Sequence, residues 1–168
     1  HQEVAADRIN ETDVELVRLF VHGLPGSGKT QVMKWLWSYF VEVWRWEHGR
    51  EFVFLAPMNT MAARLNGHTV HSWGEIQWTT DGPGGGFTLG SRKGTKDNMS
   101  SMAAKMEWCR LLLIDEIEAT AAEDLGELQE HTAEAARDLM YKWRAGTHAR
   151  PRPFGGLNML FFGDLWQL

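Results

Sequence analysis

One glycine-rich stretch near the start of the chain, GLPGSGKT, has the residue types and the spacing that phosphate binding requires. It fits the pattern G-x-x-x-x-G-K-[ST] and lies between a short apolar run and a stretch with helical spacing. Its glycines let backbone N–H groups face phosphate oxygens, and the N-terminus of the following helix favours anions. The predicted phosphate-binding loop consists of Gly23, Leu24, Pro25, Gly26, Ser27, Gly28, Lys29 and Thr30.

Two side chains at the end of this loop are expected to act on a bound nucleoside triphosphate. Lys29 would reach the β- and γ-phosphates, and the hydroxyl group of Thr30 would bind Mg²⁺. Such loops occur in kinases, GTPases, transporters, motors and helicases. The loop therefore predicts a nucleotide ligand, but it does not say what the energy of hydrolysis is used for.

An acidic pair follows a later apolar run, CRLLLI, which is expected to form a buried strand. Asp115 could hold Mg²⁺ through water, and Glu116 could polarise the attacking water as a general base. The run FFGDLWQL offers Asp164 and Gln167 at another strand end. The neutral amide of Gln167 could contact the γ-phosphate or its water, although the same residues would also suit an ordinary turn.

Apolar strands alternate with helical patterns along the chain, which predicts an α/β fold with a mostly parallel sheet and helices on both faces. In such sheets, ligands bind outside the carboxyl ends of the strands, so the three reactive strand ends should meet. We expect Asn59 or Thr60 to cap a short helix, and the last helix to break near Gly126. Strands are expected at 16–22, 51–56, 109–114 and 157–162, and helices at 29–47, 59–65, 99–108 and 120–145.

Residues 75–98 differ in character, because they are rich in Gly, polar residues and turn signals and show no strong period. We interpret them as an inserted loop or small hairpin. Arg92, Lys93 and Lys96 form a small basic cluster there. Two readings stay open for this cluster, a solvated loop and a nucleic-acid contact.

The bulk composition suits one soluble globular domain spanning residues 1–168. A net charge of −5 argues against bulk electrostatic capture of nucleic acid, but it leaves room for a local basic groove. The single cysteine, Cys109, reads as a buried thiol in a reducing, intracellular compartment: the nucleus or mitochondrion of a eukaryote or the cytoplasm of a bacterium. No run reaches the ~18 apolar residues that a membrane span needs, so we expect no membrane partner.

Nine tryptophans are unusual for this length, and four of them fall in the first helical stretch. Stacking on bases is one use of such residues, but packing is the commoner one. We therefore expect Trp35, Trp37, Trp44 and Trp46 to form a packing face.

Four segments in order resemble the PIF/RecD-like superfamily 1 DNA helicases, including the helicase portions of Helitron-type transposons. GLPGSGKT looks like the Walker A motif of this family, and LLLIDEIEAT looks like its Walker B motif. LAPMNTMAARLNGHTVHSWGEI resembles A-P-T-G-x-A-A…T-x-H-S-[FW], and RPFGGLNMLFFGDLWQL resembles P-F-G-G followed by G-D-x-x-Q-L-P-P. The similarity covers nearly the whole chain, and it is weakest at residues 75–98 and 120–145.

The resemblance implies a RecA-like first motor domain that binds ATP and Mg²⁺ and grips single-stranded DNA, in a helicase that unwinds DNA 5′-to-3′. It gives the ATP-site roles argued above to Lys29, Thr30, Asp115, Glu116 and Gln167. By the same matching, Thr60, His71 and Ser72 would contact DNA, and His68 has a weaker claim. Gln2 is the candidate for reading adenine, although a solvated terminal residue is the alternative.

Three departures from the family pattern bear on function. Met58-Asn59 replaces Thr-Gly, which puts one contact to the DNA backbone in doubt, and Glu118 replaces Ser, which adds charge near the site. The second RecA-like domain, which supplies an arginine finger in this family, is absent from these 168 residues. Such a finger is worth ~10³–10⁵ in rate in other phosphate-loop enzymes, so we expect weak nucleotide binding and little unwinding from this chain alone.

Two other classes of function remain open on the sequence. A small-molecule kinase or transferase would need an arginine-bearing lid, for which Arg144, Arg150 and Arg152 look poorly placed. A degenerate, non-catalytic binding module would not need to keep Lys29, Asp115 and Glu116.

Overall fold

A five-stranded parallel sheet forms the centre of the molecule, in the order β1-β9-β6-β2-β3. The computed structural model describes residues 16–76, 78–79, 88–89, 96–139, 146–147, 150–164 and 166–167. Gln2, Arg92 and Lys93 lie outside these residues, so the predictions made for them stay predictions. The strands are β1 (Arg18–His22), β2 (Phe52–Ala56), β3 (His68–Thr69), β6 (Leu111–Ile114) and β9 (Asn158–Gly163).

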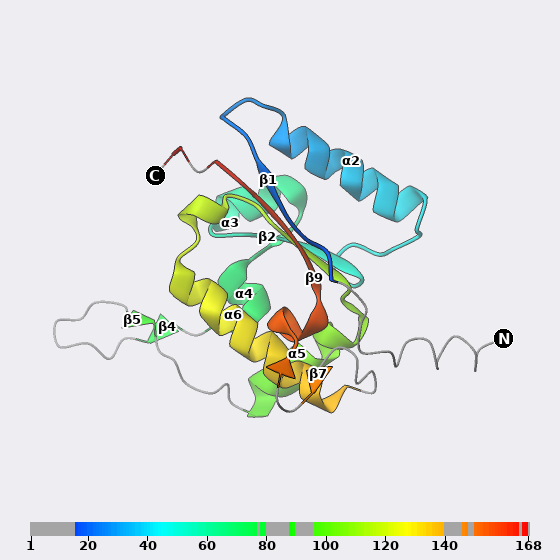
Figure 1. Ribbon diagram of the computed structural model, residues 1–168, viewed down its shortest axis with the longest axis vertical. Helices are drawn as coiled ribbons and strands as arrows, with labels where there is room; N and C mark the ends of the chain where they lie inside the picture. The colour runs from blue at the N-terminus through cyan, green and yellow to red at the C-terminus, as the bar shows by residue number, and fades with distance from the viewer. Residues whose placement is uncertain are drawn as a thin grey trace.

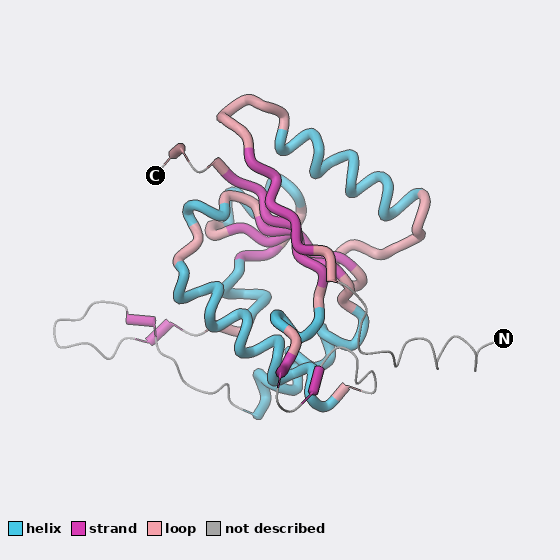
Figure 2. Tube along the Cα trace, viewed as in Figure 1, coloured by secondary structure: helices cyan, strands magenta, loops and turns pink. Residues whose placement is uncertain are grey.

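Helices cover both faces of this sheet, as the alternation of strands and helices predicted. Figure 1 shows β1 and β9 running between α2 on one side and α4 and α6 on the other, and Figure 2 shows the strands of the five-stranded sheet grouped in magenta at the centre. One core cluster packs α2 against the sheet around Met33, Phe40 and Phe162. The other lies between the sheet and the opposite helices, around Trp73, Met106 and Leu128. The helices are α2 (Lys29–Glu42), α3 (Asn59–Ala62), α4 (Val70–Gly74), α5 (Lys96–Trp108) and α6 (Ala122–Ala135).

Helix α2 ends at Glu42, earlier than the predicted residue 47. Arg45 adopts a left-handed backbone with φ of 58°, which turns the chain. The turn brings the rings of Trp44 and Trp46 within 5.3 and 5.5 Å of the ring of Phe40. The expected packing role therefore holds for Trp46, whereas Trp35, Trp37 and Trp44 are 65%, 39% and 47% exposed.

The short helix α3 continues into a 3₁₀ turn, η1 (Ala63–Leu65), and ends at Asn66 in a left-handed conformation. The predicted cap was wrong: the N-cap residue is Met58, and no side chain caps this helix. Strand β3 and helix α4 were not predicted from the sequence, since elements of two and five residues are too short to show a period.

Helix α6 is shorter than the predicted 120–145, because a 3₁₀ turn, η3 (Ala136–Asp138), follows Ala135. Gly126 lies inside the helix, so the expected break near it was wrong. The first turn carries Glu123 and Asp124, which suits the positive end of the helix dipole.

Two small antiparallel pairs complete the fold. Strands β4 (Trp78–Thr79) and β5 (Thr88–Leu89) pair within the glycine-rich insertion, as expected for a hairpin excursion. Strands β7 (Gly146–Thr147) and β8 (Arg150–Pro151) precede the 3₁₀ segment η4 (Pro153–Gly156), which leads into β9. In the part of the chain that the structure describes, no helix has the length and apolar character of a membrane span.

Candidate functional site

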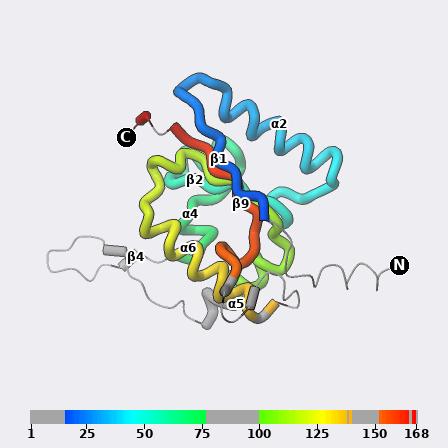
Figure 3. The backbone as a smooth tube through the Cα atoms, viewed as in Figure 1, coloured from blue at the N-terminus to red at the C-terminus, as the bar shows by residue number. Residues whose placement is uncertain are grey.

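Three strand tips meet at one edge of the central sheet. β9 lies between β1 and β6, and all three strands run parallel, so their carboxyl ends point the same way. The registers align Phe20 with Phe161 and Phe161 with Ile114. Figure 3 shows the first described strand, in blue, lying against the last one, in red. The sheet therefore unites the glycine-rich loop, the acidic pair and the GDLWQL segment.

The glycine-rich loop has the backbone shape of a phosphate-binding loop. Gly26 and Gly28 have φ of 76° and 93°, a region that suits glycine. Helix α2 begins directly after Gly28, and its first free N–H groups face the loop. The ammonium group of Lys29 donates to the carbonyls of Gly23 and, at 3.3 Å, Leu24. The loop thus holds a lysine over a helix N-terminus, where an anion is favoured.

The acidic pair lies at the tip of β6, close to this lysine. The N–H of Asp115 donates to the carbonyl of Leu55 at 2.9 Å, and its Oδ1 accepts from the N–H of Glu116 at 3.0 Å. Burial raises the pKa of the Asp115 carboxyl, while Lys29 acts in the opposite direction. A carboxyl group with a raised pKa beside a lysine is common at functional sites.

Glu116 and Glu118 form a second carboxyl pair at the same tip. Glu116 has a left-handed backbone with φ of 52°, which is uncommon for a residue other than glycine. Burial raises the pKa of the Glu116 carboxyl, and the neighbouring carboxyl groups of Glu118 and Asp115 raise it further. A raised pKa makes the Glu116 carboxylate a stronger base, which is the direction that suits a group accepting a proton from water.

The tip of β9 is shaped by Gly163 and Asp164. The carbonyl of Gly163 accepts from the N–H of Gly23 at 3.2 Å, which ties this tip to the start of the phosphate loop. A Cβ at Gly163 would lie 2.4 Å from Glu118 Oε2 and 2.6 Å from Ile117 Cγ2, so a larger residue would force these side chains to shift. Asp164 is buried, and its Oδ1 accepts from the N–H of Trp166 at 3.0 Å. Its carbonyl accepts from the N–H of Gln167, whose side chain is exposed near these tips.

The residues at these tips suit Mg²⁺. Thr30 offers a hydroxyl oxygen at the start of α2, and Asp115 offers a carboxyl oxygen from β6. Mg²⁺ is usually held by one or two protein oxygens, with phosphates and water completing an octahedron. Within the described residues no group of three or more His, Cys, Asp or Glu could hold a metal ion on its own.

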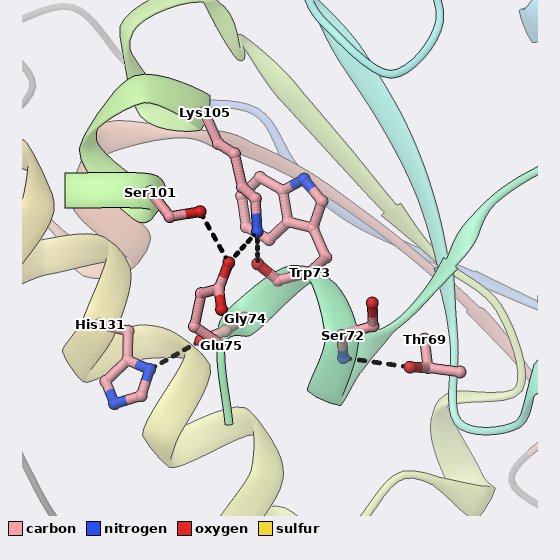
Figure 4. A network of polar contacts seen from close by, with 8 residues as sticks. All are labelled: Thr69, Ser72, Trp73, Gly74, Glu75, Ser101, Lys105 and His131. Carbon is pink, nitrogen blue, oxygen red and sulfur yellow. Dashed lines mark hydrogen bonds and ion pairs between the residues drawn. The ribbon is translucent and has the colours of Figure 1, made fainter. Parts of the chain in front are cut away.

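The segment predicted to contact DNA follows β2 and β3. Thr60 on α3 and Ser72 on α4 are exposed, whereas the side chain of His71 is only 11% exposed. His71 Nε2 lies 3.2 Å from Asp124 Oδ1, so its imidazole faces a carboxyl group of α6. The N–H of Ser72 donates to the hydroxyl of Thr69 at 3.1 Å, which caps α4 (Figure 4). His68 is exposed on β3.

A polar network anchors α4, and sequence reasoning missed it. Lys105 on α5 donates to the carbonyl of Trp73 at 3.1 Å and pairs with the carboxylate of Glu75, which also accepts from Ser101 at 2.8 Å (Figure 4). On the other side, His131 Nδ1 lies 2.7 Å from the carbonyl of Gly74. No sequence signal marks this network, because its members come from three separate segments.

The comparison with protein families agrees with this arrangement. The chain matches the family described as AAA domain over residues 1–141. This chain belongs to the AAA domain family. No curated protein matches it in sequence.

The fold of the AAA domain is similar to several solved structures. It resembles Bacteroides Pif1 bound to ssDNA, with 24% identity, a TM-score of 0.59 and coverage of 99% of this chain and 32% of that one. It also resembles Bacteroides sp Pif1 in complex with ADP-AlF4, with 26% identity and a TM-score of 0.58, over 99% of this chain and 32% of that one. The match to Pif1 helicase from Candida albicans has 22% identity and a TM-score of 0.63, and it covers 99% of this chain and 32% of that one.

These matches confirm the RecA-like fold and the resemblance to the PIF-type helicases. The chain spans about a third of the length of the Pif1 structures that it matches. The AAA domain described above therefore corresponds to one part of a longer relative.

The raised pKa of Asp115 has a consequence for stability that can be measured. Ionisation of this carboxyl opposes folding at neutral pH, and the penalty fades as the pH falls through the raised pKa toward the ordinary value of 3.8. We expect Asp115→Asn to raise the Tm of the ligand-free AAA domain at about pH 7, and the gain to shrink toward pH 4. Thermal unfolding followed by circular dichroism in EDTA checks this. Glu130→Gln, at an exposed position in the middle of α6, serves as the control, and a lower Tm for Asp115→Asn at neutral pH would contradict the argument.

Proposed function

We propose that this AAA domain binds ATP and Mg²⁺ and single-stranded DNA, and that it serves as the first motor domain of a 5′-to-3′ DNA helicase. The observation that carries the proposal is the meeting of the phosphate loop, the acidic pair and Gln167 at adjacent strand tips. The 26% identity over 99% of the chain to Bacteroides sp Pif1, solved in complex with ADP-AlF4, supports it.

In this proposal each ATP-site residue has one task. The loop N–H groups and Lys29 bind the phosphates, and Thr30 and Asp115 hold Mg²⁺, which neutralises charge on the phosphates when bound. Glu116 accepts a proton from the attacking water, because its raised pKa suits that transfer. Gln167 orients the same water through its amide.

The DNA-binding part of the proposal rests on exposed residues of α3 and α4. Thr60 and Ser72 are exposed on consecutive helices beyond the carboxyl ends of β2 and β3. Relatives of the chain have been solved bound to ssDNA and at forked dsDNA. We propose that Thr60, His71 and Ser72 line the path of the single strand, with His71 also held by Asp124.

We further propose that a second RecA-like domain completes the motor. The outer edge of β1 has no partner strand within the described residues, and Leu19 and Phe20 on this strand are 56% and 42% exposed. An open edge with exposed apolar side chains suits further packing. In this proposal the phosphate loop forms one side of the ATP site, and the second domain forms the other side and supplies the arginine that accelerates hydrolysis.

This division of labour predicts what the 168-residue chain does alone. We expect it to bind a fluorescent ATP analogue weakly in the presence of Mg²⁺ and to bind labelled oligo(dT). Hydrolysis should stay ~10³-fold or more below a complete motor, because in this proposal the accelerating arginine comes from the second domain. Fluorescence titrations and a phosphate-release assay, with and without oligo(dT), check these expectations.

Three results would point elsewhere. Helicase-level turnover by the isolated chain would contradict the half-site proposal. Phosphoryl transfer to a small metabolite would favour a kinase, and the absence of any nucleotide binding would leave a non-catalytic binding module.

A further inference from the structure

Helix α4 docks on one face of helix α6. Asp124, Leu128 and His131 are spaced so that they share this face, and each of them meets α4. Asp124 Oδ1 lies 3.2 Å from His71 Nε2, and His131 Nδ1 lies 2.7 Å from the carbonyl of Gly74. A side chain at Gly74 would lie 3.0 Å from Leu128 Cδ1, so the two helices are in close contact.

The pair formed by His71 and Asp124 is largely buried, since each side chain is only 11% exposed. Asp124 lies in the first turn of α6, where an acidic side chain commonly caps its own helix, yet no side chain caps α6. The carboxylate reaches across to α4 instead. Burying a carboxylate is costly unless it is paired, so removal of its partner should be felt on both helices.

The beginning of α6 is tied to the ATP site. The carbonyl of Glu116 accepts from the N–H of Ala119 at 2.9 Å and from the hydroxyl of Thr120 at 3.4 Å. Thr120 is buried, and α6 begins directly after it and Ala121. These two hydrogen bonds join Glu116 to the residues directly before α6, whose first turn holds Asp124.

The body of α6 also contacts the segment that leads to the third strand tip. The N–H of Phe154 in η4 donates to Gln129 Oε1, and Gly155 packs against the backbone of Thr132. η4 runs into β9, which ends in Gly163. Helix α6 thus contacts α4, which carries the DNA-contact candidates His71 and Ser72. It also follows the segment that holds the acidic pair and contacts η4, the segment that leads through β9 to Gln167.

We propose that the contact between His71 and Asp124 couples the two ligands of this domain, so that nucleotide at the phosphate loop changes the affinity for single-stranded DNA at α4, and the reverse. Asp124 is a positioning residue in this scheme, because it acts through His71 and touches neither ligand. The inference rests on the proposed function. Coupling of this kind is carried by contiguous packed elements and is reciprocal between the two sites.

The test measures the coupling factor directly. The affinity of the 168-residue chain for labelled oligo(dT) is titrated with and without a saturating non-hydrolysable ATP analogue and Mg²⁺, and the affinity for the analogue is titrated with and without oligo(dT). We expect the wild-type chain to show a coupling of roughly 5-fold or more, equal in both directions. Asp124→Ala should bring the coupling to within about 2-fold of none, while each ligand alone still binds.

A matched control separates coupling from general loosening of α4. Lys105→Met removes the anchor that joins α4 to α5, so it should lower the Tm but keep the coupling. If Asp124→Ala does not fold, Asp124→Ser replaces it, because its short side chain cannot reach His71. Loss of coupling in either folded Asp124 variant, with coupling kept in Lys105→Met, supports the proposal.

Other outcomes overturn it. Coupling that persists in a folded Asp124 variant, or that is lost equally in Lys105→Met, shows that the pair is not the link. Independent binding of the two ligands to the wild-type chain also sinks the coupling, while the proposed function stands. Absence of nucleotide binding would instead remove the proposed function itself.

Discussion

Lys29→Ala is expected to weaken the binding of a fluorescent ATP analogue by about 100-fold in the presence of Mg²⁺, which corresponds to roughly 2.7 kcal/mol. The ammonium group lies at the N-terminus of α2, among carbonyls of the loop that would hold the phosphates. Charge-assisted hydrogen bonds to phosphate are about twice as strong as neutral ones, and here no other basic side chain follows the loop directly. We therefore expect the lost binding affinity to come from the contacts of Lys29 with the β- and γ-phosphates.

Comparison of ligands sharpens this prediction. The analogue of ATP should lose more affinity than AMP, because AMP lacks the phosphates that Lys29 reaches. Lys34→Ala is the matched control, since Lys34 is an exposed lysine on the same helix, and it should bind as the wild type does. Equal affinity of Lys29→Ala and the wild type for the ATP analogue would show that the loop does not bind phosphates in the predicted way.

The part of the site that lies on strand tips could be predicted from the sequence. Apolar runs identified β1, β2, β6 and β9 to within two residues, because buried parallel strands read as continuous apolar segments. Parallel strands share one carboxyl end, so Lys29, Asp115 and Gln167 were expected at the same edge before the sheet was known. A local pattern together with a general rule of topology was enough for this part.

The parts that could not be predicted depend on contacts between distant segments. Nothing near His71 in sequence indicates that Asp124 pairs with it, and nothing near Glu75 indicates Lys105. The left-handed backbone of Glu116 was also hidden, since such a conformation in a residue other than glycine is imposed by its surroundings. Helix α2 ended early for a related reason, because Trp46 gains more by folding back onto Phe40 than by continuing the helix.

Gly155→Ala is expected to destabilise the domain by about 3 kcal/mol, the largest effect on stability that we expect from a single added methyl group. Gly155 has φ of +59°, which costs an L-residue about 1 kcal/mol or more. The added Cβ would also lie 2.4 Å from the carbonyl oxygen of Thr132 and 2.7 Å from Met106 Cε. The Thr132 carbonyl belongs to the backbone of α6 and cannot move cheaply, so overpacking adds about 1–3 kcal/mol.

Gly126→Ala is the matched comparison, because Gly126 lies in α6, the helix on which Gly155 packs. This change should raise the stability of the domain rather than lower it. A Cβ at Gly126 meets nothing within 4 Å, and the position lies inside the helix with an ordinary backbone. Alanine there should stabilise the domain by about 1 kcal/mol, because glycine is the poorer helix former. In thermal unfolding the Tm should fall by roughly 6–12 °C for Gly155→Ala and rise by roughly 2–4 °C for Gly126→Ala. Shifts of the same sign in the two variants would contradict the close packing of η4 on α6, the contact through which that helix reaches the third strand tip.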